Sequence, residues 1–397
     1  MINNINDTNK TTSVLSYVWR YPGTHRKEVA NILGIRLNTV TNIVKNLLNE
    51  DWLEERKLEP QSVGRAPISL CVNKKNKLVA AFTYDNQELY GTLLNSTGEL
   101  IVEDRERLKL KEPSDLYKAL EKVYNRLSLK TNSEIVAVGI ADNGMIDFCK
   151  GTIIRSELFP NLRNIPLKEE VASRLGLPVF VEDYTRACAF SEYMSKPEWR
   201  QNNSSMMYME YGERVGFAFV SPNGVWSGKG LAGELGHVII MPDGPLCRCG
   251  AKGCLESLIN FVAVKRKTIE ISEHTTNSLL NRHESFKVEN VFEAYMRGDR
   301  AAKTVLDSFF PYIGMSLSIL VSTMHPDFMV IGSHVSSASA CIAEGVKKEM
   351  DIRTLPEIAS SIKVISATIN KTTALKGISL MAFDKMIMSK SQMLISS

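Results

Sequence analysis

The stretch GELGHVIIMPDGPLCRCGAKGCLES, Gly233 to Ser257, holds one histidine, three cysteines and two glutamates in a chain with 6 histidines and 7 cysteines over 397 residues. Its imidazole and three thiols form a Cys₃His set, which suits tetrahedral Zn²⁺. Glycines between the second and third thiols let the chain fold back tightly. With no open coordination position, the predicted zinc is structural, and reduced cysteines without a metal are the alternative. The predicted ligands are His237, Cys247, Cys249 and Cys254.

Two carboxylates flank these predicted ligands. Glu234 lies three residues before His237, and Glu256 lies two residues after Cys254. One metal would therefore fix the backbone near both carboxylates, which could accept hydrogen bonds from a ligand. The alternative is that both glutamates lie on the surface and bind nothing.

Length and composition limit the class of protein. A chain of 397 residues, 44% hydrophobic, can bury large cores and suggests two or three domains. The first ten residues are polar, unlike a secretory signal, and no apolar run is expected to approach the ~20 residues that span a bilayer. We expect a cytoplasmic protein with no membrane partner. The four other cysteines lie singly among apolar neighbours, so a disulfide framework is not expected.

The excess positive charge lies in the first fifth of the chain. The formal net charge is +4, and residues 1–75 hold 11 Lys and Arg against 7 Asp and Glu, whereas the remainder holds 37 of each. Apolar residues there recur at spacings of three and four, which predicts three short amphipathic helices. Pro22-Gly23 separates the first two helices, and Gly34 makes the turn to the third. Thr24 and Asn38 are the expected caps of the second and third helices.

Two short helices joined by a turn that contains glycine form the helix-turn-helix arrangement. The outward face of the third helix would offer short or basic side chains to base edges and phosphates. WLEERKLEP and APISLCV are predicted to be two strands joined by residues 61–65, a wing whose Arg65 would enter a minor groove. A helical hairpin with no role on DNA is the alternative. The predicted contacts of the third helix are Arg36, Asn38, Thr39, Thr41, Asn42 and Lys45.

From Leu78 the pattern changes to alternating strands and helices. LVAAFTY, LYGTLLN, IVAVGIA and PVFVED predict strands, with helices at DLYKALEKVYNRLSL and LKEEVASRLG. A second cycle includes SMMYMEY, GFAFVS, DFMVIG and KVISA. The order predicts two successive α/β lobes, and ligands of such folds usually bind in the cleft between lobes, at the strand ends.

Six stretches carry a family resemblance that runs from about residue 12 to the C-terminal helix. They are LAGELGHV (231–238), CRCGAKGCLE (247–256), GIADNGMID (139–147), LGLPVFVEDYTRACA (175–189), HPDFMVIG (325–332) and VGRAP (63–67). Together they resemble the ROK family of repressors, open reading frames and kinases, and the first two stretches are the specific part. The resemblance implies an α/β fold of the actin-like ATPase (ribonuclease H-like) type, whose two lobes enclose a sugar. It also implies an N-terminal winged helix-turn-helix domain, similar to xylose- or N-acetylglucosamine-responsive repressors.

The resemblance assigns candidate sugar contacts as well. In the family, glutamates at the positions of Glu234 and Glu256 contact the sugar, and a histidine at the position of His237 is placed near zinc and near sugar. The family kinases use a Glu-Asn-Asp motif, where this chain has Val181-Glu182-Asp183. Asp183 is kept, but Glu182 replaces the asparagine and adds an acceptor, which predicts a different sugar or pose. A further candidate contact is Asn143.

Phosphoryl transfer needs glycine-rich turns that bring backbone amides close to phosphates. Where the family kinases have Asp-x-Gly-x-Thr, this chain has residues 83–87, Thr-Tyr-Asp-Asn-Gln. Their Gly-Thr-Gly-x-Gly turn corresponds to residues 212–216, Gly-Glu-Arg-Val-Gly, in which Glu213 would face a triphosphate. The later Gly-Gly has become Gly332-Ser333. These changes predict that the chain is not an enzyme.

We therefore expect a sugar-responsive transcriptional repressor. Its domains would be a winged helix-turn-helix domain (1–72), a first actin-like lobe (73–190) and a second lobe with the zinc site and the C-terminal helix (191–397). The expected partners are palindromic operator DNA and a sugar or sugar phosphate between the lobes, with the chain as a homodimer or homotetramer. Two alternatives remain: an ATP-dependent sugar kinase with a regulatory N-terminal domain, and a repressor whose effector is another protein.

Overall fold

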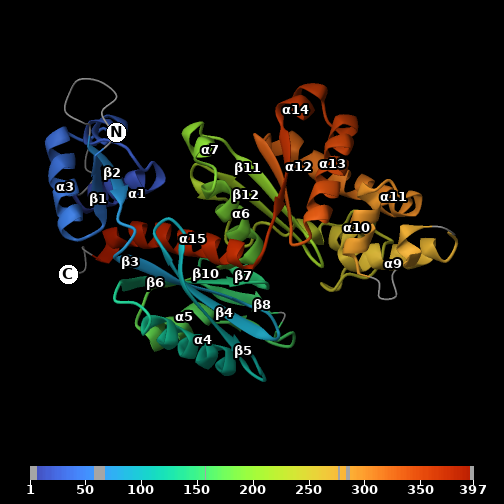
Figure 1. Cartoon of the computed structure of the whole chain (residues 1–397), viewed down its shortest axis with the longest axis horizontal. Coiled ribbons are helices and arrows are strands. Elements are labelled where there is room, and N and C mark those ends of the chain that lie inside the picture. The colour runs from blue at the N-terminus through green and yellow to red at the C-terminus, as the bar shows by residue number, and fades with distance from the viewer. Residues whose placement is uncertain (1–6, 58–67, 157, 276–277, 283–286, 394–397) are drawn as a thin grey trace. The chain divides into compact units, whose positions relative to one another are not determined.

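The computed structural model describes residues 7–57, 68–156, 158–275, 278–282 and 287–393 (Figure 1). The chain divides into two compact units. Unit 1 comprises Met1–Gln201 with Thr373–Ser397, and unit 2 comprises Asn202–Thr372. Each unit contains a five-stranded sheet, so the predicted two cycles of strands and helices are confirmed.

Three helices and two antiparallel strands form the N-terminal part of unit 1. The apolar side chains at three and four spacing face inward, as predicted, and Val14, Val29 and Val40 have no exposed surface. Gly34 closes the second helix in the left-handed conformation, with φ 64°. The elements are α1 (Asp7–Arg20), α2 (Arg26–Leu33), α3 (Leu37–Asn49), β1 (Leu53–Lys57) and β2 (Ile68–Val72).

Both predicted helix caps are wrong. His25 precedes α2 and Arg36 precedes α3, and neither side chain makes a capping hydrogen bond. Thr24 pairs with Leu70 of β2, whose N–H donates to the Thr24 carbonyl at 2.8 Å. Because this pairing keeps Thr24 in a bridge with β2, α2 begins later. Asn38 lies inside the first turn of α3.

The sheet of unit 1 has the strand order β10-β6-β3-β4-β5, in which β3, β6 and β10 are parallel and β4 and β5 are antiparallel additions. Helices α4 and α5 cover one face and α15 covers the other (Figure 1). A second, three-stranded sheet follows β6. The bounds are β3 (Lys77–Tyr84), β4 (Glu88–Asn95), β5 (Leu100–Arg107), α4 (Pro113–Ser128), β6 (Glu134–Asp142), β7 (Met145–Asp147), β8 (Thr152–Arg155), β9 (Arg163–Ile165), α5 (Leu167–Leu175), β10 (Val179–Asp183), α6 (Tyr184–Met194), α7 (Pro197–Gln201) and α15 (Lys371–Met393).

The C-terminal helix α15 packs on unit 1, although the sequence suggested that it would belong to the second lobe. The Arg20 guanidinium at the end of α1 lies 3.1 Å from a carboxylate oxygen of Asp384. The centroid of the Phe383 ring lies 5.9 Å from that of Trp19 and 6.2 Å from that of Trp52. The C-terminal helix therefore shares an aromatic cluster with the N-terminal part.

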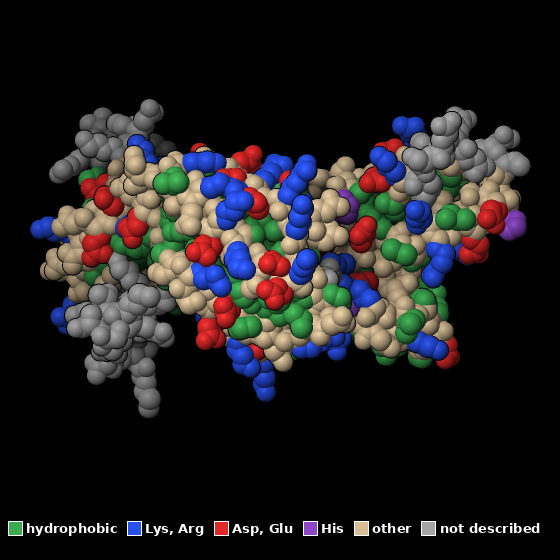
Figure 2. Space-filling view, turned by 90° about the horizontal axis from the view of Figure 1, so that it is seen from below, with side chains coloured by type: hydrophobic (Ala, Val, Ile, Leu, Met, Phe, Trp, Pro, Cys, Tyr) green, Lys and Arg blue, Asp and Glu red, His purple; other side chains and the backbone are tan. Residues whose placement is uncertain are grey.

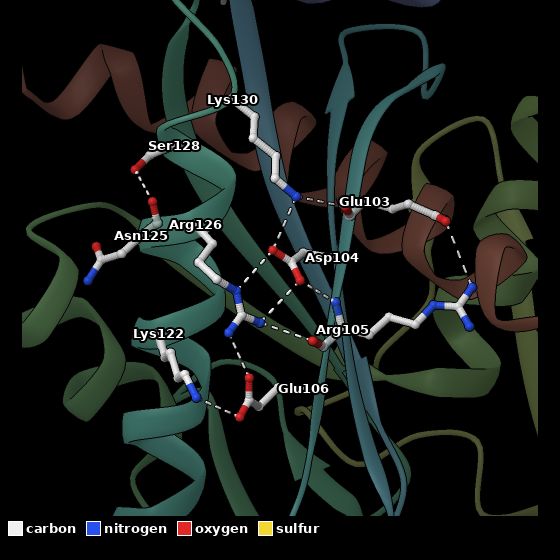
Figure 3. Close-up of polar contacts among 9 residues, drawn as sticks. All are labelled: Glu103, Asp104, Arg105, Glu106, Lys122, Asn125, Arg126, Ser128 and Lys130. Carbon is white, nitrogen blue, oxygen red and sulfur yellow. Dashed lines mark hydrogen bonds and ion pairs between the residues drawn. The ribbon is translucent and has the colours of Figure 1, made fainter.

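Strand β5 was not predicted, because its sequence LIVEDRER is mostly charged and it forms the edge of the sheet. Its carboxylates pair with α4: Arg126 lies 3.0 Å from Asp104 and 2.7 Å from Glu106, which also accepts from Lys122 at 2.8 Å (Figure 3). Lys and Arg are interspersed with Asp and Glu over the face in Figure 2. Charged edge strands of this kind resist pairing with other sheets.

The sheet of unit 2 has the order β13-β12-β11-β14-β15. Its core includes the rings of Tyr211, Phe261 and Phe292, whose centroids lie 5.4 to 6.1 Å apart. The bounds are β11 (Met206–Tyr211), β12 (Val215–Ser221), β13 (Gly224–Val225), η1 (Leu235–His237), α8 (Leu255–Ile259), α9 (Phe261–Ser272), η2 (Leu279–Arg282), α10 (Glu289–Met296), α11 (Arg300–Asp307), α12 (Phe310–Met324), β14 (Phe328–Ser333), α13 (Ser336–Arg353), α14 (Pro356–Ser361) and β15 (Lys363–Thr368).

One stretch corrects the expectation that no apolar run approaches the length of a membrane span. Arg300–Met324 is long and apolar enough by length and composition. It is divided between α11 and α12, and Ile313, Leu317 and Val321 lie in the core of unit 2 with no exposed surface. A buried core helix of a globular protein accounts for this composition.

Candidate metal cluster and ligand-binding residues

The four predicted metal ligands converge in unit 2. Their ligand atoms all lie within 4.8 Å of one another. His237 Nδ1 lies 3.6 Å from Cys247 Sγ, and Cys249 Sγ lies 3.6 Å from Cys254 Sγ. The side chains come from three places, the end of η1, the turn at 247–250 and the residue before α8. The cluster can therefore hold a metal ion.

Two glycines shape the turns of the cluster as the sequence predicted. Gly250 has φ 97° and Gly253 has φ 72°, which is left-handed backbone that other residues rarely adopt. A Cβ on Gly253 would lie 1.5 Å from the Met241 carbonyl oxygen. Only glycine lets these backbone segments approach so closely.

Binding of a metal would change the acid-base chemistry of the thiols. Burial raises the pKa of Cys254 to about 12 and also raises the pKa of Cys247. The pKa of Cys249 is lowered, chiefly by a hydrogen bond from the Ala251 backbone. A cation that binds sulfur and nitrogen would stabilise all three thiolates, which burial alone does not.

Glu256 is buried, with 4% of its side chain exposed, so the surface alternative is wrong for this residue. Its Oε1 accepts from Arg248 Nε at 2.7 Å, and its Oε2 accepts from the Val215 backbone N–H at 3.1 Å. These donors compensate the loss of water around the carboxylate. Sequence reasoning missed Arg248, whose place between two cysteines of the cluster was the available signal.

Glu234 is more accessible, with 42% of its side chain exposed, and its Oε2 lies 3.9 Å from His237 Nε2. The preceding Gly233 has φ 115°, and a Cβ there would lie 2.5 Å from the Phe217 carbonyl oxygen. The backbone next to Glu234 therefore packs closely against β12. A hydroxyl ligand in solution can reach this carboxylate.

In unit 1, Glu182 is buried at the end of β10 and forms an ion pair with Arg186. It also accepts from the Asp183 backbone at 2.9 Å, and Lys385 of α15 lies 4.0 Å away. Asp183 caps α6, because its Oδ1 accepts from the Arg186 N–H at 3.0 Å. Both carboxylates thus organise the start of α6, and their contact with a sugar stays a prediction. Sequence reasoning missed Arg186, four residues after Glu182.

Asn143 follows β6, and its amide donates to the Tyr84 carbonyl at 3.4 Å. The neighbouring Asp142 is buried and accepts from the Tyr84 hydroxyl and the Gly144 N–H. Burial raises the pKa of Tyr84 well above its ordinary value, and the Asp142 charge raises it further. Asp142 therefore fixes the loop that presents Asn143, and sequence reasoning missed it.

In both turns that were compared with kinase phosphate turns, backbone amides donate to a carboxylate of the protein. In the first, Asp85 Oδ1 accepts from the backbone N–H of Gln87 at 2.8 Å and of Glu88 at 2.9 Å. In the second, the Val215 N–H donates to Glu256. The Gln87 and Val215 amides of these turns are thus bonded inside the protein, beside negative charge.

The predicted DNA-contacting face of α3 is accessible. Arg36, Asn38, Asn42 and Lys45 are exposed, and Thr39 is half-buried. Thr41 is also exposed, but its hydroxyl donates to the Leu37 carbonyl at 2.8 Å within the helix. Arg65 and the predicted wing tip lie outside the described residues.

Comparisons with known proteins give consistent matches. A sequence model described as the ROK family matches residues 87–385. The xylose repressor of Caldicellulosiruptor bescii is 25% identical over 83% of this chain and 84% of the repressor. The glucokinase of Thermotoga maritima is 26% identical over 63% of this chain and 80% of the kinase. A solved structure described as a ROK family transcriptional regulator, a homologue of the Escherichia coli MLC protein, is 20% identical. The structural match covers 97% of this chain and 98% of the regulator's chain, with a TM-score of 0.83.

Proposed function

Because this chain belongs to the ROK family, we propose that it is a transcriptional repressor that releases operator DNA when a sugar binds. Its α/β fold is the actin-like ATPase type of that family. The extent of similarity carries the proposal: the xylose repressor match covers 83% of the chain, against 63% for the glucokinase. The protein would act in the cytoplasm, where operator DNA lies, as a homodimer or homotetramer.

In this proposal, residues 1–72 form a winged helix-turn-helix domain. Asn38, Thr39 and Asn42 of α3 would contact base edges, whereas Arg36 and Lys45 would contact phosphates. The exposure of this helix face supports the assignment. Two-fold symmetry of a dimer would require a palindromic operator.

The proposed effector is a sugar or sugar phosphate. Its contacts would be Asn143, Glu182 and Asp183 in unit 1, and Glu234, His237 and Glu256 in unit 2. Carboxylates accept hydrogen bonds from ring hydroxyls, and a side-chain amide can both accept and donate them. The fixed backbone at Glu234 and the buried, oriented carboxylate of Glu256 support the unit 2 contacts.

The function is tested with full-length protein and an operator selected from random DNA. Fluorescence anisotropy measures operator affinity while D-xylose, D-glucose, N-acetyl-D-glucosamine and their phosphates are titrated. We expect one of these to weaken operator binding at least fivefold. If none of these sugars releases the protein from the selected operator, a protein effector would be favoured instead.

The proposed metal is structural Zn²⁺ on His237 and the three cysteines. Cys249→Ala should lower the zinc content from about one ion per chain to below about 0.3 and should reduce the melting temperature, because a structural metal contributes to folding. Cys149→Ala is the matched control, since Cys149 is an exposed thiol outside the cluster. Full zinc retention by Cys249→Ala would contradict the assignment.

The glucokinase relatives favour one other candidate, an ATP-dependent sugar kinase. The carboxylates bonded to the two turns argue against it, because Asp85 and Glu256 occupy backbone amides there and would repel a triphosphate. A coupled assay of ADP formation with the same sugars should give no turnover above background. Turnover that Asp183→Asn abolishes would support the kinase.

A further inference from the structure

Arg248 lies between two ligands of the metal cluster, Cys247 and Cys249. The chain turns tightly here, because the Gly250 N–H donates to the Cys247 carbonyl at 2.9 Å and the Cys247 N–H donates to the Ala251 carbonyl at 2.8 Å. With both neighbouring thiols in the cluster, the backbone of Arg248 has little freedom. A bound metal would therefore fix the direction in which the Arg248 side chain leaves the chain.

The Arg248 side chain extends to Glu256. Nε donates to Oε1 at 2.7 Å and Nη2 donates to Oε2 at 3.4 Å, so the guanidinium forms a fork on one carboxylate. Glu256 is buried, whereas 47% of the Arg248 side chain is exposed. The Val215 N–H holds the carboxylate from another side. The Arg248 guanidinium and the Val215 N–H together determine which lone pairs of Glu256 remain for a ligand.

We propose that Arg248 is a positioning residue through which the metal cluster sets the sugar specificity of Glu256. The inference rests on the proposed function, in which Glu256 accepts a hydrogen bond from a sugar hydroxyl. An acceptor that points in one direction selects a hydroxyl at one ring position, because an epimer leaves the buried carboxylate poorly paired. A salt bridge that only stabilised the loop would change stability without changing this selection.

The experiment uses the full-length, zinc-loaded protein and compares Arg248→Met and Arg248→Lys with Lys252→Met. Lys252 is the matched control, since it is an exposed cation in the same loop. Isothermal titration calorimetry measures Kd for D-xylose and its epimers D-lyxose, D-ribose and L-arabinose. Zinc content is measured for every variant.

We expect Arg248→Met to keep its zinc, to weaken the best-bound pentose at least tenfold and to reduce the affinity ratio between that pentose and its epimers to below threefold. Arg248→Lys should bind the pentose more tightly than Arg248→Met does, because lysine keeps the positive charge but cannot form the fork. Lys252→Met should stay within twofold of wild type. Unchanged affinity ratios in Arg248→Met would overturn the proposal.

A second measurement needs no sugar. A fork that couples the cluster to Glu256 restrains the chain between two zinc ligands, so it should also slow zinc loss. Zinc transfer to a chromogenic chelator should accelerate several-fold in Arg248→Met and in Glu256→Gln, and the double variant should be no faster than either. Additive rates would overturn the coupling. If no pentose binds the wild type, the proposed effector class fails for these sugars, and the same titrations with D-glucose and its epimers D-mannose and D-galactose decide the inference.

Discussion

Asp299 joins two helical segments of unit 2 through one carboxylate. Its Oδ1 accepts from the Ala302 N–H at 2.9 Å and caps α11, while its Oδ2 accepts from the Leu279 N–H at 2.8 Å at the start of η2. Burial by itself raises the pKa of Asp299, but these hydrogen bonds outweigh burial and lower the pKa below its ordinary value. Folding therefore favours the charged form.

We expect Asp299→Ala to reduce the free energy of unfolding by about 1–2 kcal/mol, the usual cost of losing a helix cap. Because the folded-state pKa is depressed, this stabilisation is present above the unfolded pKa and is lost as the pH falls through the folded pKa. Denaturant unfolding of both proteins between pH 7 and pH 3 measures the difference, which should shrink toward acid.

Asp243→Ala, a change at an exposed position of the same unit, should alter the free energy of unfolding by less than about 0.5 kcal/mol. A difference between wild type and Asp299→Ala that grows toward acid would show that the carboxylate is not stabilised in its charged form.

Among the elements, helix α3 has two kinds of side chain on its exposed face. Lys45 is a flexible cation, and Asn42, one turn earlier, is a neutral side chain with one donor group and one acceptor group. Both are exposed, so their proposed roles differ in chemistry rather than in accessibility. Cations contact phosphates of any sequence, whereas amides distinguish base edges.

We expect Lys45→Ala to weaken binding to all sequences alike and to reduce the dependence of affinity on salt by about one phosphate contact. Asn42→Ala should instead relax the preference for one base pair, at a cost of about 1–3 kcal/mol on the preferred operator. Anisotropy titrations at several salt concentrations, on the operator and on single-base variants, separate these effects. Equal losses on all sequences from both substitutions would refute the assignment.

The elements also show how far the sequence could predict the structure. Buried strands such as β3 and β6 were predicted, because their apolar runs reflect burial directly. The metal cluster was predicted because its ligands are close in sequence. Strand β5 was missed because its charges pair with α4, and the Thr24 cap was wrong because β2 pairs with Thr24. In both cases the partner comes from a distant segment of the chain. The spacing of residues along the sequence does not show which distant segments pack together.

For the whole molecule, the proposed DNA binding and the proposed sugar binding would be two equilibria of one chain. The N-terminal part contacts α15 through Arg20, Asp384 and the Phe383 cluster, so it is joined to the rest of unit 1 by more than its linker. A sugar that favours one conformation of the chain would change operator affinity only by its differential affinity for the two conformations. Such coupling is typically worth about 1–3 kcal/mol.

We expect the effector sugar to weaken operator binding by roughly 5–150-fold, and operator DNA to weaken sugar binding by the same factor. Equilibrium titrations of each ligand, with and without the other, measure both factors. Glu256→Ala should bind operator normally and ignore the sugar. Unequal factors at equilibrium, or a sugar response that survives in Glu256→Ala, would disprove this coupling.

The aromatic cluster around Phe383 gives the protein a built-in optical reporter. Trp19 and Trp52 are buried beside that ring, and they are two of the 4 tryptophans in the chain. Indole emission shifts to longer wavelength when water reaches the ring. If operator release loosens the N-terminal part from α15, the emission of these two residues moves while that of Trp226, already exposed, stays constant. Effectors can then be screened by the intrinsic tryptophan fluorescence of the unlabelled protein.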